Sequence, residues 1–381
     1  MKPRILQQIS ATILSLMAML PTIGRAQINP GSTGSDGALD FSAITNATNV
    51  VIDMSDHPTG IYNYTYVNIP ANVTVTFIPN ANNTPVVWLV QNNVVISGNV
   101  SVSGKNFGNG SGVSSLGGSG GPGGWSGGNG GSGGTSGQGP GGGAAALSGL
   151  AGGGSYNYGN QFLIPLLGGS GGGGNNNGGG GGGGALLIAA ANSININGSV
   201  LSQGGNGFGN NEGSGSGGAI RLVASQVSGN GQILANGGRN GQSGGAGRLR
   251  FDTYDNEFSG GIFGQFTSGS QFIIIPSAGQ LPQLAVTSVG GVPVSASPTG
   301  VLSTPDAVLS AQQNNPIPIV VSCVNLPLNS TITVSVTPMN GSPVSAVGYN
   351  NTGTQSSSTA TVSLNMPRGG GLIYATAATG N

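Results

Sequence analysis

Short apolar runs follow one another along the first part of the chain, and turn residues separate them. The runs Val50–Asp53, Tyr62–Val67, Val73–Ile78 and Val86–Val90 are rich in β-branched and aromatic residues, with Pro, Gly and Asn between them. Runs of this composition and length are typical of β-strands. Residues from about 27 to 104 are therefore predicted to be β-structure throughout.

One pattern then recurs: an apolar strand, a short alternating strand, a turn with Gly, another short strand, and glycines. Gly184–Gly205 and Gly218–Gly238 are two good copies, Val86–Gly104 is a looser one, and Ala246–Thr253 begins a fourth. A unit of about 20–25 residues cannot bury its apolar side alone, so stacked units with one shared core are expected. Antiparallel hairpins with similar turns are the alternative. The recurrence of whole strand-turn-strand units favours a right-handed parallel β-solenoid.

Glycine-rich tracts join these units at matching positions. They are Gly104–Gly154, Gly168–Gly184, Gly204–Gly218 and Gly237–Gly247. Such segments can be disordered excursions, or they can pack as extended polyproline-II-like strands, because a residue without a side chain permits close backbone approach. Partial order near the solenoid, with disorder at the tips, is the favoured expectation. The apolar run Phe162–Leu167 interrupts the glycines and is expected to dock on the body.

From about residue 281 glycine becomes rarer, and runs that alternate at period two return. They include Leu284–Val289, Ser330–Thr337 and Ser358–Leu364. About seven short strands in about 100 residues predict a β-sandwich of the Ig-like class. The single cysteine, Cys323, lies in an apolar run and is expected to be buried. The predicted fold is all-β, with a solenoid over 27–277, whose longest glycine loops span 104–184, and an Ig-like sandwich over 278–381.

The first residues have the pattern of an export signal. Lys2 and Arg4 precede the apolar segment Ile9–Leu20, and small residues stand at positions −3 and −1 of a cleavage site before Gln27. Residues 1–26 are therefore predicted to be a signal peptide, with an N-terminal anchor helix as the alternative. No second apolar segment long enough to span a membrane follows, so no span is expected in the mature chain. The protein is expected to be secreted or at the cell surface, or in the periplasm.

Composition narrows the classes of partner. Glycine accounts for 77 of 381 residues and charged residues for 5%, against about 7% and about 25% in typical soluble domains. Of nine Lys and Arg, Lys2, Arg4 and Arg25 belong to the leader, so six remain against nine Asp and Glu, a net charge of −3. Nucleic-acid binders carry clustered Lys and Arg. Nucleic acid is therefore not an expected partner.

The chain resembles exported bacterial glycine-rich, parallel-β-helix-like surface proteins. Ile69–Val75, Val94–Gly98 and Ala235–Gly238 carry this resemblance, which covers roughly residues 34–260. The C-terminal part is similar to Ig-like or fibronectin-type modules of exported proteins. The resemblance implies a fold and a location outside the cytoplasm, and no reaction.

An acidic cluster is the best candidate for catalysis. Parallel β-helices often carry polysaccharide hydrolases or lyases, and hydrolysis of a glycosidic bond needs paired carboxylates. Asp252, Asp255 and Glu257 lie close together in the chain, and on a strand the last two share a face while Asp252 faces the other way. An acidic cap where the glycine repeat ends is the favoured interpretation of this cluster.

A row of tyrosines is the candidate for carbohydrate contact. On a strand, Tyr62, Tyr64 and Tyr66 would line one face and could stack on sugars, although such a row is more often part of a core. The only histidine is His57, and Gly104–Gly247 contains no Asp. Neither a zinc site nor the calcium site of glycine-rich β-rolls is therefore expected. Gly-Lys occurs once and Asn106 follows it, so no P-loop and no cofactor are expected.

The sequence thus predicts a secreted or cell-surface structural or adhesive protein without catalytic activity. Its expected partners are extracellular polysaccharide or other envelope components. A carbohydrate-active or carbohydrate-binding β-helix is the first alternative. An ice- or surface-binding protein is the second, and the short Thr-x-Thr runs are too few to favour it.

Overall fold

The structure is a computed structural model. It describes residues 27–107, 115–131, 134–146, 150–155, 158–274, 282–296, 298, 300, 302 and 304–378. The expected signal peptide, residues 1–26, and the expected boundary between 277 and 278 lie outside these residues.

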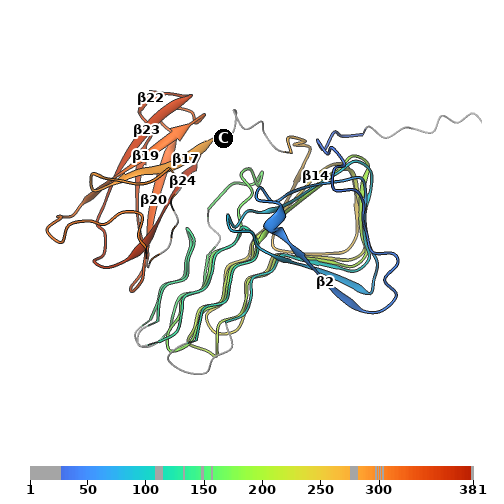
Figure 1. The fold of residues 1–381 in the computed structure, drawn as a ribbon, viewed down its shortest axis with the longest axis horizontal. Coiled ribbons are helices and arrows are strands. Elements are labelled where there is room, and N and C mark those ends of the chain that lie inside the picture. Colours follow the sequence, from blue (N-terminus) through green and yellow to red (C-terminus); the bar gives the residue numbers. More distant parts are fainter. Residues whose placement is uncertain are drawn as a thin grey trace, which may run out of the picture.

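The chain is all-β, as predicted, and its first part consists of parallel sheets (Figure 1). Seen end-on in Figure 1, the stacked strands outline a triangle. Two of its faces belong to one ten-stranded sheet, because the two halves of β12 and β14 pair with different neighbours. The third face is a six-stranded sheet. We call the body formed by β1–β16 the parallel body.

The strands of the first face are β3 (Ile61–Tyr64), β6 (Val86–Val90), β9 (Ala185–Ala190), β16 (Gln265–Gly269) and the first halves of β12 (Ala219–Gly229) and β14 (Arg248–Phe258). The second face has β1 (Leu39–Asp40), β4 (Val67–Ile69), β7 (Val94–Ile96), β10 (Ser193–Ile196) and the second halves of β12 and β14. The third face has β2 (Thr48–Asp53), β5 (Val73–Ile78), β8 (Asn99–Ser101), β11 (Ser199–Leu201), β13 (Gln232–Leu234) and β15 (Gly261–Phe263). The short helix η1 (Met54–Asp56) follows β2.

The pairing register follows the alignment of the sequence copies. Ala185 pairs with Ala219 and Ile220 with Leu249 in neighbouring strands. All described strands of the parallel body pair in parallel, so the alternative of antiparallel hairpins does not hold for them. Equivalent apolar residues thus stack on one another along the body.

Inward-facing residues of the three faces form one core. Ile188, Leu222 and Phe251 are fully buried there. Burying a side chain of this size stabilises the fold by about 1.5–3 kcal/mol relative to leaving it exposed. The run Phe162–Leu167 docks outside the first face, as predicted, with Leu163 packed near Ala185 and Ala219.

Residues 282–378 form a second β-structure, which we call the C-terminal unit. Its strands pair antiparallel in a five-stranded and a three-stranded sheet. The first has β17 (Gln283–Val289), β18 (Val292–Pro293), β19 (Ile317–Val324), β22 (Thr352–Thr354) and β23 (Ser357–Leu364), and the second has β20 (Thr331–Pro338), β21 (Val344–Tyr349) and β24 (Gly371–Ala378). Both contribute to one apolar core, where Cys323 is buried as predicted, and burial raises the pKa of its thiol.

Candidate functional site

The glycine tracts run side by side as extended strands next to the parallel body. Figure 1 shows them as the teal to yellow strands that leave one corner of the triangle. Backbone hydrogen bonds join them to one another over their described length. We call this assembly the glycine array; its segments are 102–107, 115–131, 134–146, 150–155, 168–184, 202–218 and 235–247.

The strand 168–174 lies at the centre of the array, and over residues 171–174 its N–H groups donate with a period of three residues. Three successive residues donate to three different neighbouring strands, and the fourth returns to the first neighbour. The bonds are Gly171 N–H to Gln138 O (3.0 Å), Gly172 to Gly180 (2.9 Å), Gly173 to Gly152 (2.8 Å) and Gly174 to Thr135 (2.8 Å). Three residues per turn is the geometry of a polyproline-II-type helix, here made of glycine.

The carbonyl groups of the same strand follow the same period toward other neighbours. From residue 169 onward its oxygens accept from strands 124–131, 212–218 and 141–146 in turn. The strand therefore has six hydrogen-bonded neighbours, which are 124–131, 134–139, 141–146, 150–155, 177–184 and 212–218. The array is a lattice of backbone hydrogen bonds in several directions, unlike a sheet, whose strands bond in only two.

Close approach explains why these positions are glycine. A Cβ on Gly172 would overlap the carbonyl of Gly213, and one on Gly182 would overlap the carbonyl of Gly169. No φ in the left-handed region is involved at either position, so the constraint is space and not backbone conformation. Of the two possibilities that the sequence left open, packed extended strands are found in the described residues. The segments 108–114, 132–133 and 147–149 lie outside them.

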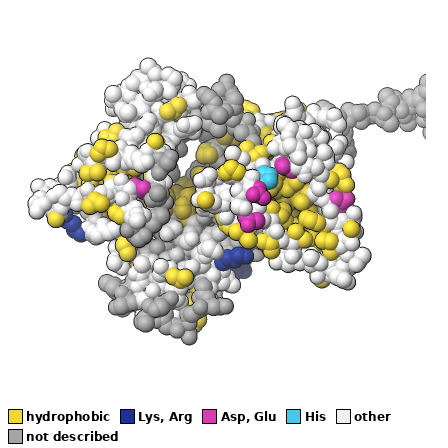
Figure 2. All heavy atoms as spheres, viewed as in Figure 1, with side chains coloured by type: hydrophobic (Ala, Val, Ile, Leu, Met, Phe, Trp, Pro, Cys, Tyr) yellow, Lys and Arg dark blue, Asp and Glu magenta, His cyan; other side chains and the backbone are white. Residues whose placement is uncertain are grey.

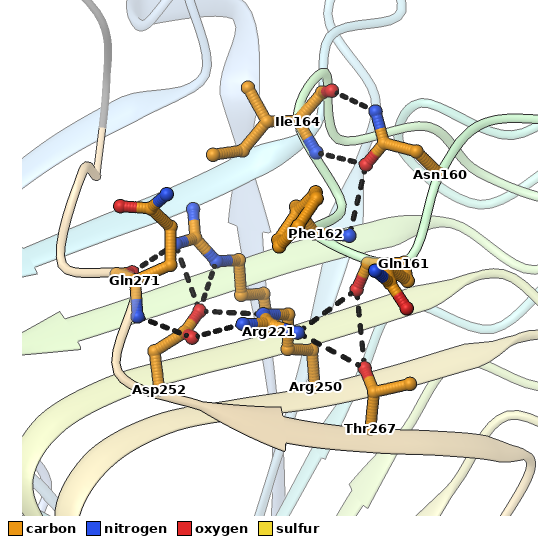
Figure 3. Close-up of polar contacts among 9 residues, drawn as sticks. All are labelled: Asn160, Gln161, Phe162, Ile164, Arg221, Arg250, Asp252, Thr267 and Gln271. Carbon is orange, nitrogen blue, oxygen red and sulfur yellow. Dashed lines mark hydrogen bonds and ion pairs between the residues drawn. The ribbon is translucent and has the colours of Figure 1, made fainter. Parts of the chain in front are cut away.

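The candidate acid Asp252 is buried outside the first face of the parallel body, between two arginines (Figure 3). Its Oδ2 accepts from Arg221 Nε at 3.0 Å and its Oδ1 from Arg250 Nη2 at 2.7 Å. The backbone N–H of Gln271 donates to Oδ1 at 2.9 Å. The two guanidinium groups thus balance the charge of the carboxylate, and N–H groups of three residues donate to it. This arrangement fits a structural ion pair better than a proton-transfer group.

Two segments cover these ion pairs. The ring of Phe162 lies 5.1 Å from the guanidinium carbon of Arg250, and Gln161 O accepts from the same side chain. Arg221 also donates to Gln271 O at 2.7 Å. Burial lowers the pKa of Arg221, and the nearby Asp252 acts in the opposite direction. The cluster therefore fastens the 160–164 loop and residues 271–272 to the body.

The other two candidate acids lie elsewhere. Asp255 is partly buried and accepts from Gln226 Nε2 at 3.2 Å, whereas Glu257 is exposed. Both belong to the second half of β14, on the second face, while Asp252 belongs to the first. The structure therefore does not bring the three carboxylates together into one site.

The three tyrosines do not share one face either. Tyr62 and Tyr64 are in β3 and point into the core, where they are 3% and 5% exposed. The strand ends at Tyr64, and Tyr66 is exposed with its hydroxyl donating to Asp40 Oδ2 at 2.9 Å. Burial, followed by the nearby Asp36, Asp53 and Asp56, raises the pKa of Tyr62 to about 12. Of these three tyrosines, Tyr66 alone is exposed.

His57 is a neighbour that the sequence did not connect with Tyr62. Its ring stacks on that of Tyr62 at 4.1 Å, and its Nε2 lies 3.3 Å from Asp36 Oδ1. Figure 2 shows this histidine beside acidic side chains at one end of the parallel body, with apolar side chains around them. Within the described ranges, no group of three or more His, Cys, Asp and Glu could hold a metal ion.

The glycine array also contacts the C-terminal unit, which the sequence did not predict. Trp125 packs edge-on against Tyr374 at 6.1 Å, and the N–H of Gly139 donates to the Tyr374 hydroxyl at 3.0 Å. A lone Trp in a glycine tract was the only signal of this contact. Over the part of the chain that the structure describes, no helix is long and apolar enough to cross a membrane.

No protein-family model, curated protein or solved structure matches the chain.

Proposed function

We propose that this chain is a secreted or cell-surface structural and adhesive protein without catalytic activity. In this proposal the parallel body is a right-handed β-solenoid and the C-terminal unit is an Ig-like β-sandwich. The observation that carries it is the glycine array, in which each central strand is bonded to neighbours on all sides. The glycine positions of this lattice leave no room for a Cβ, and the buried side chains among them are mostly serines such as Ser170 and Ser216, so it supplies rigidity and shape.

The surroundings of the array support a passive role. The candidate acid Asp252 is engaged by two arginines and covered by Phe162 and its neighbours. Figure 2 shows charged side chains only in small separate groups on the face that it presents. A rigid, weakly charged projection is suited to contact with extracellular polysaccharide or other envelope components.

The test uses a variant that breaks the lattice without touching any candidate acid. Gly172→Ala places a methyl group against Gly213, whereas Ser119→Ala changes an exposed position of an outer array strand and serves as the control. Purified wild-type and Ser119→Ala protein should bind to cells from which the native protein has been removed, and Gly172→Ala should not. Equal binding by all three would contradict the proposal.

The carbohydrate-active alternative needs its own experiment. Asp252→Ala would confuse catalysis with stability, because it removes the partner of two buried arginines. Asp255→Ala with Glu257→Ala avoids this problem, since neither residue belongs to the ion-pair cluster. Turnover on a panel of polysaccharides that disappears in this double variant would replace the structural proposal with the enzymatic one. We expect no turnover by either protein.

A further inference from the structure

The strand 134–139 lies at an edge of the glycine array, and its N–H groups keep the three-residue period. Thr135 and Gln138 donate to the strand 124–131, and Gly137 donates to Gly143. The N–H groups of Ser136 and Gly139 point in the third direction. In the central strands of the array, N–H groups that point this way donate to a neighbouring glycine strand. For 134–139, none of the array segments lies on that side.

The C-terminal unit fills this position. Ser136 N–H donates to Met339 O at 3.2 Å, and Gly139 N–H donates to the hydroxyl of Tyr374 at 3.0 Å. In return, the hydroxyl of Thr337 donates to Gly139 O at 3.4 Å. These groups of β20, β24 and the turn after β20 thus supply the acceptors and the donor that an additional glycine strand would supply.

The lattice accepts strands in either direction. The strand 168–174 runs parallel to 124–131, since Trp125, Gly128 and Gly131 donate to residues 169, 172 and 175. It runs antiparallel to 177–184, since residues 169 and 172 donate to residues 183 and 180. Two identical edges related by a two-fold axis would therefore find compatible groups on each other, which is the usual geometry of a homodimer interface.

We propose that residues 134–139 are a strand-acceptor edge, which the C-terminal unit covers within one chain and which the same edge of a second copy occupies when it is uncovered. The second copy is the fitting partner because it carries a glycine strand with the same period and the same pattern of donors and acceptors. Uncovered strand edges are templates for pairing, and natural proteins cover them for this reason. The proposal holds whether or not the protein serves in adhesion.

The experiment uses the full mature chain with Thr337→Glu and Tyr374→Glu combined. Both side chains lie on the outer side of the three-stranded sheet, outside the core of the C-terminal unit, so the unit should fold. At position 337 the carboxylate faces the carbonyl oxygen of Gly139 and repels it. Both positions are covered by the array, so two carboxylates there must lose their water while the surfaces stay together, and this should separate them. We expect the mass from light scattering to double relative to wild type as concentration rises, and the amides of Ser136 and Gly139 to exchange freely at low concentration only.

Two further variants identify the edge. Ser136→Pro in the double variant removes the outward N–H, and proline fits an extended strand of this type because its φ is close to that of polyproline II. Ser136→Ala also loses the hydroxyl, which accepts from Ala145 N and donates to Gly341 O, but keeps the N–H. We expect the proline variant to return to the wild-type mass and the alanine variant to keep the doubled mass.

Three results would overturn the proposal. One is a double variant that keeps the wild-type mass although the amides of residues 136 and 139 exchange freely. Another is protection of these amides at the lowest concentration, because the contacts of Thr337 and Tyr374 would then not be the cover. The third is a doubled mass that survives Ser136→Pro, which would place the association on another surface.

Discussion

At the scale of single residues, the residue type is fixed for opposite reasons at the central glycines of the array and at Asp252. Gly172 has no space for any side chain, whereas Asp252 is required because two buried guanidinium groups surround it. The sequence predicted neither. The missed signal for Asp252 was the pairing of Arg221 and Arg250, since both interrupt apolar strands at the same position of consecutive copies. A charge repeated inside a strand indicates a buried partner.

Gly172→Ala should destabilise the protein by about 1–3 kcal/mol, which is the usual cost of forcing extra carbon into a packed interior. The added methyl group would overlap the backbone at Gly213, which side-chain rotation cannot relieve. Ser119→Ala, on an exposed array position, should change the free energy of unfolding by less than about 0.5 kcal/mol. Denaturant unfolding measures both values, and equal values would show that the lattice is not close-packed in solution.

Asp252→Ala should lower the free energy of unfolding by about 3–5 kcal/mol, because it leaves the charges of two buried arginines without a partner. The matched substitution Glu257→Ala concerns an exposed acid of the same strand and should have little effect. Thermal unfolding followed by circular dichroism distinguishes the two variants. A small loss for Asp252→Ala would indicate that water reaches Arg221 and Arg250 in solution.

At the scale of elements, the parallel strands were predictable and the array was not. Apolar strand units recur in sequence, and their alignment is also their pairing register, as Ala185 and Ala219 show. A glycine tract, by contrast, has the same composition whether it is a flexible linker or a packed strand. What decides is the number of neighbouring tracts, and that number depends on how the units stack. The prediction that Tyr62, Tyr64 and Tyr66 line one face was wrong, because the strand β3 ends at Tyr64 and the sequence pattern did not show that end.

Hydrogen exchange tests the order of the glycine strands directly. Amides of 169–174 and 179–184 bond to neighbouring backbone over most of their length, so they should exchange as slowly as those of β9 and β12. A linker of this composition would exchange within seconds at neutral pH. Peptide-resolved exchange with mass spectrometry gives the answer, with the exposed position 119 as a fast-exchanging reference. Rapid exchange across 169–174 would contradict the array.

At the scale of the whole molecule, the glycine array connects the parallel body with the C-terminal unit. Its strands continue into β9, β12 and β14 at one end, and its edge at Ser136 and Gly139 contacts the C-terminal unit. The sequence indicated two β-structures but not their docking. Ser136 and Gly139 resemble every other residue of the tract, and their role comes only from the lattice direction in which they point.

Docking of the C-terminal unit should weaken at alkaline pH through Tyr374. Burial raises the pKa of this phenol to about 12, while the hydrogen bond from Gly139 acts in the opposite direction. Because the docked state favours the neutral phenol, the stabilisation of docking by Tyr374 is complete below pH 10.0, the ordinary pKa of the phenol. It is lost as pH rises toward about 12.

Trp125 packs against this ring, so tryptophan emission should change over this pH range in the wild type. Tyr374→Phe cannot ionise and should change less, although Tyr62 and Tyr64 titrate late in both proteins. Identical pH profiles would mean that the Tyr374 hydroxyl does not hold the two parts together.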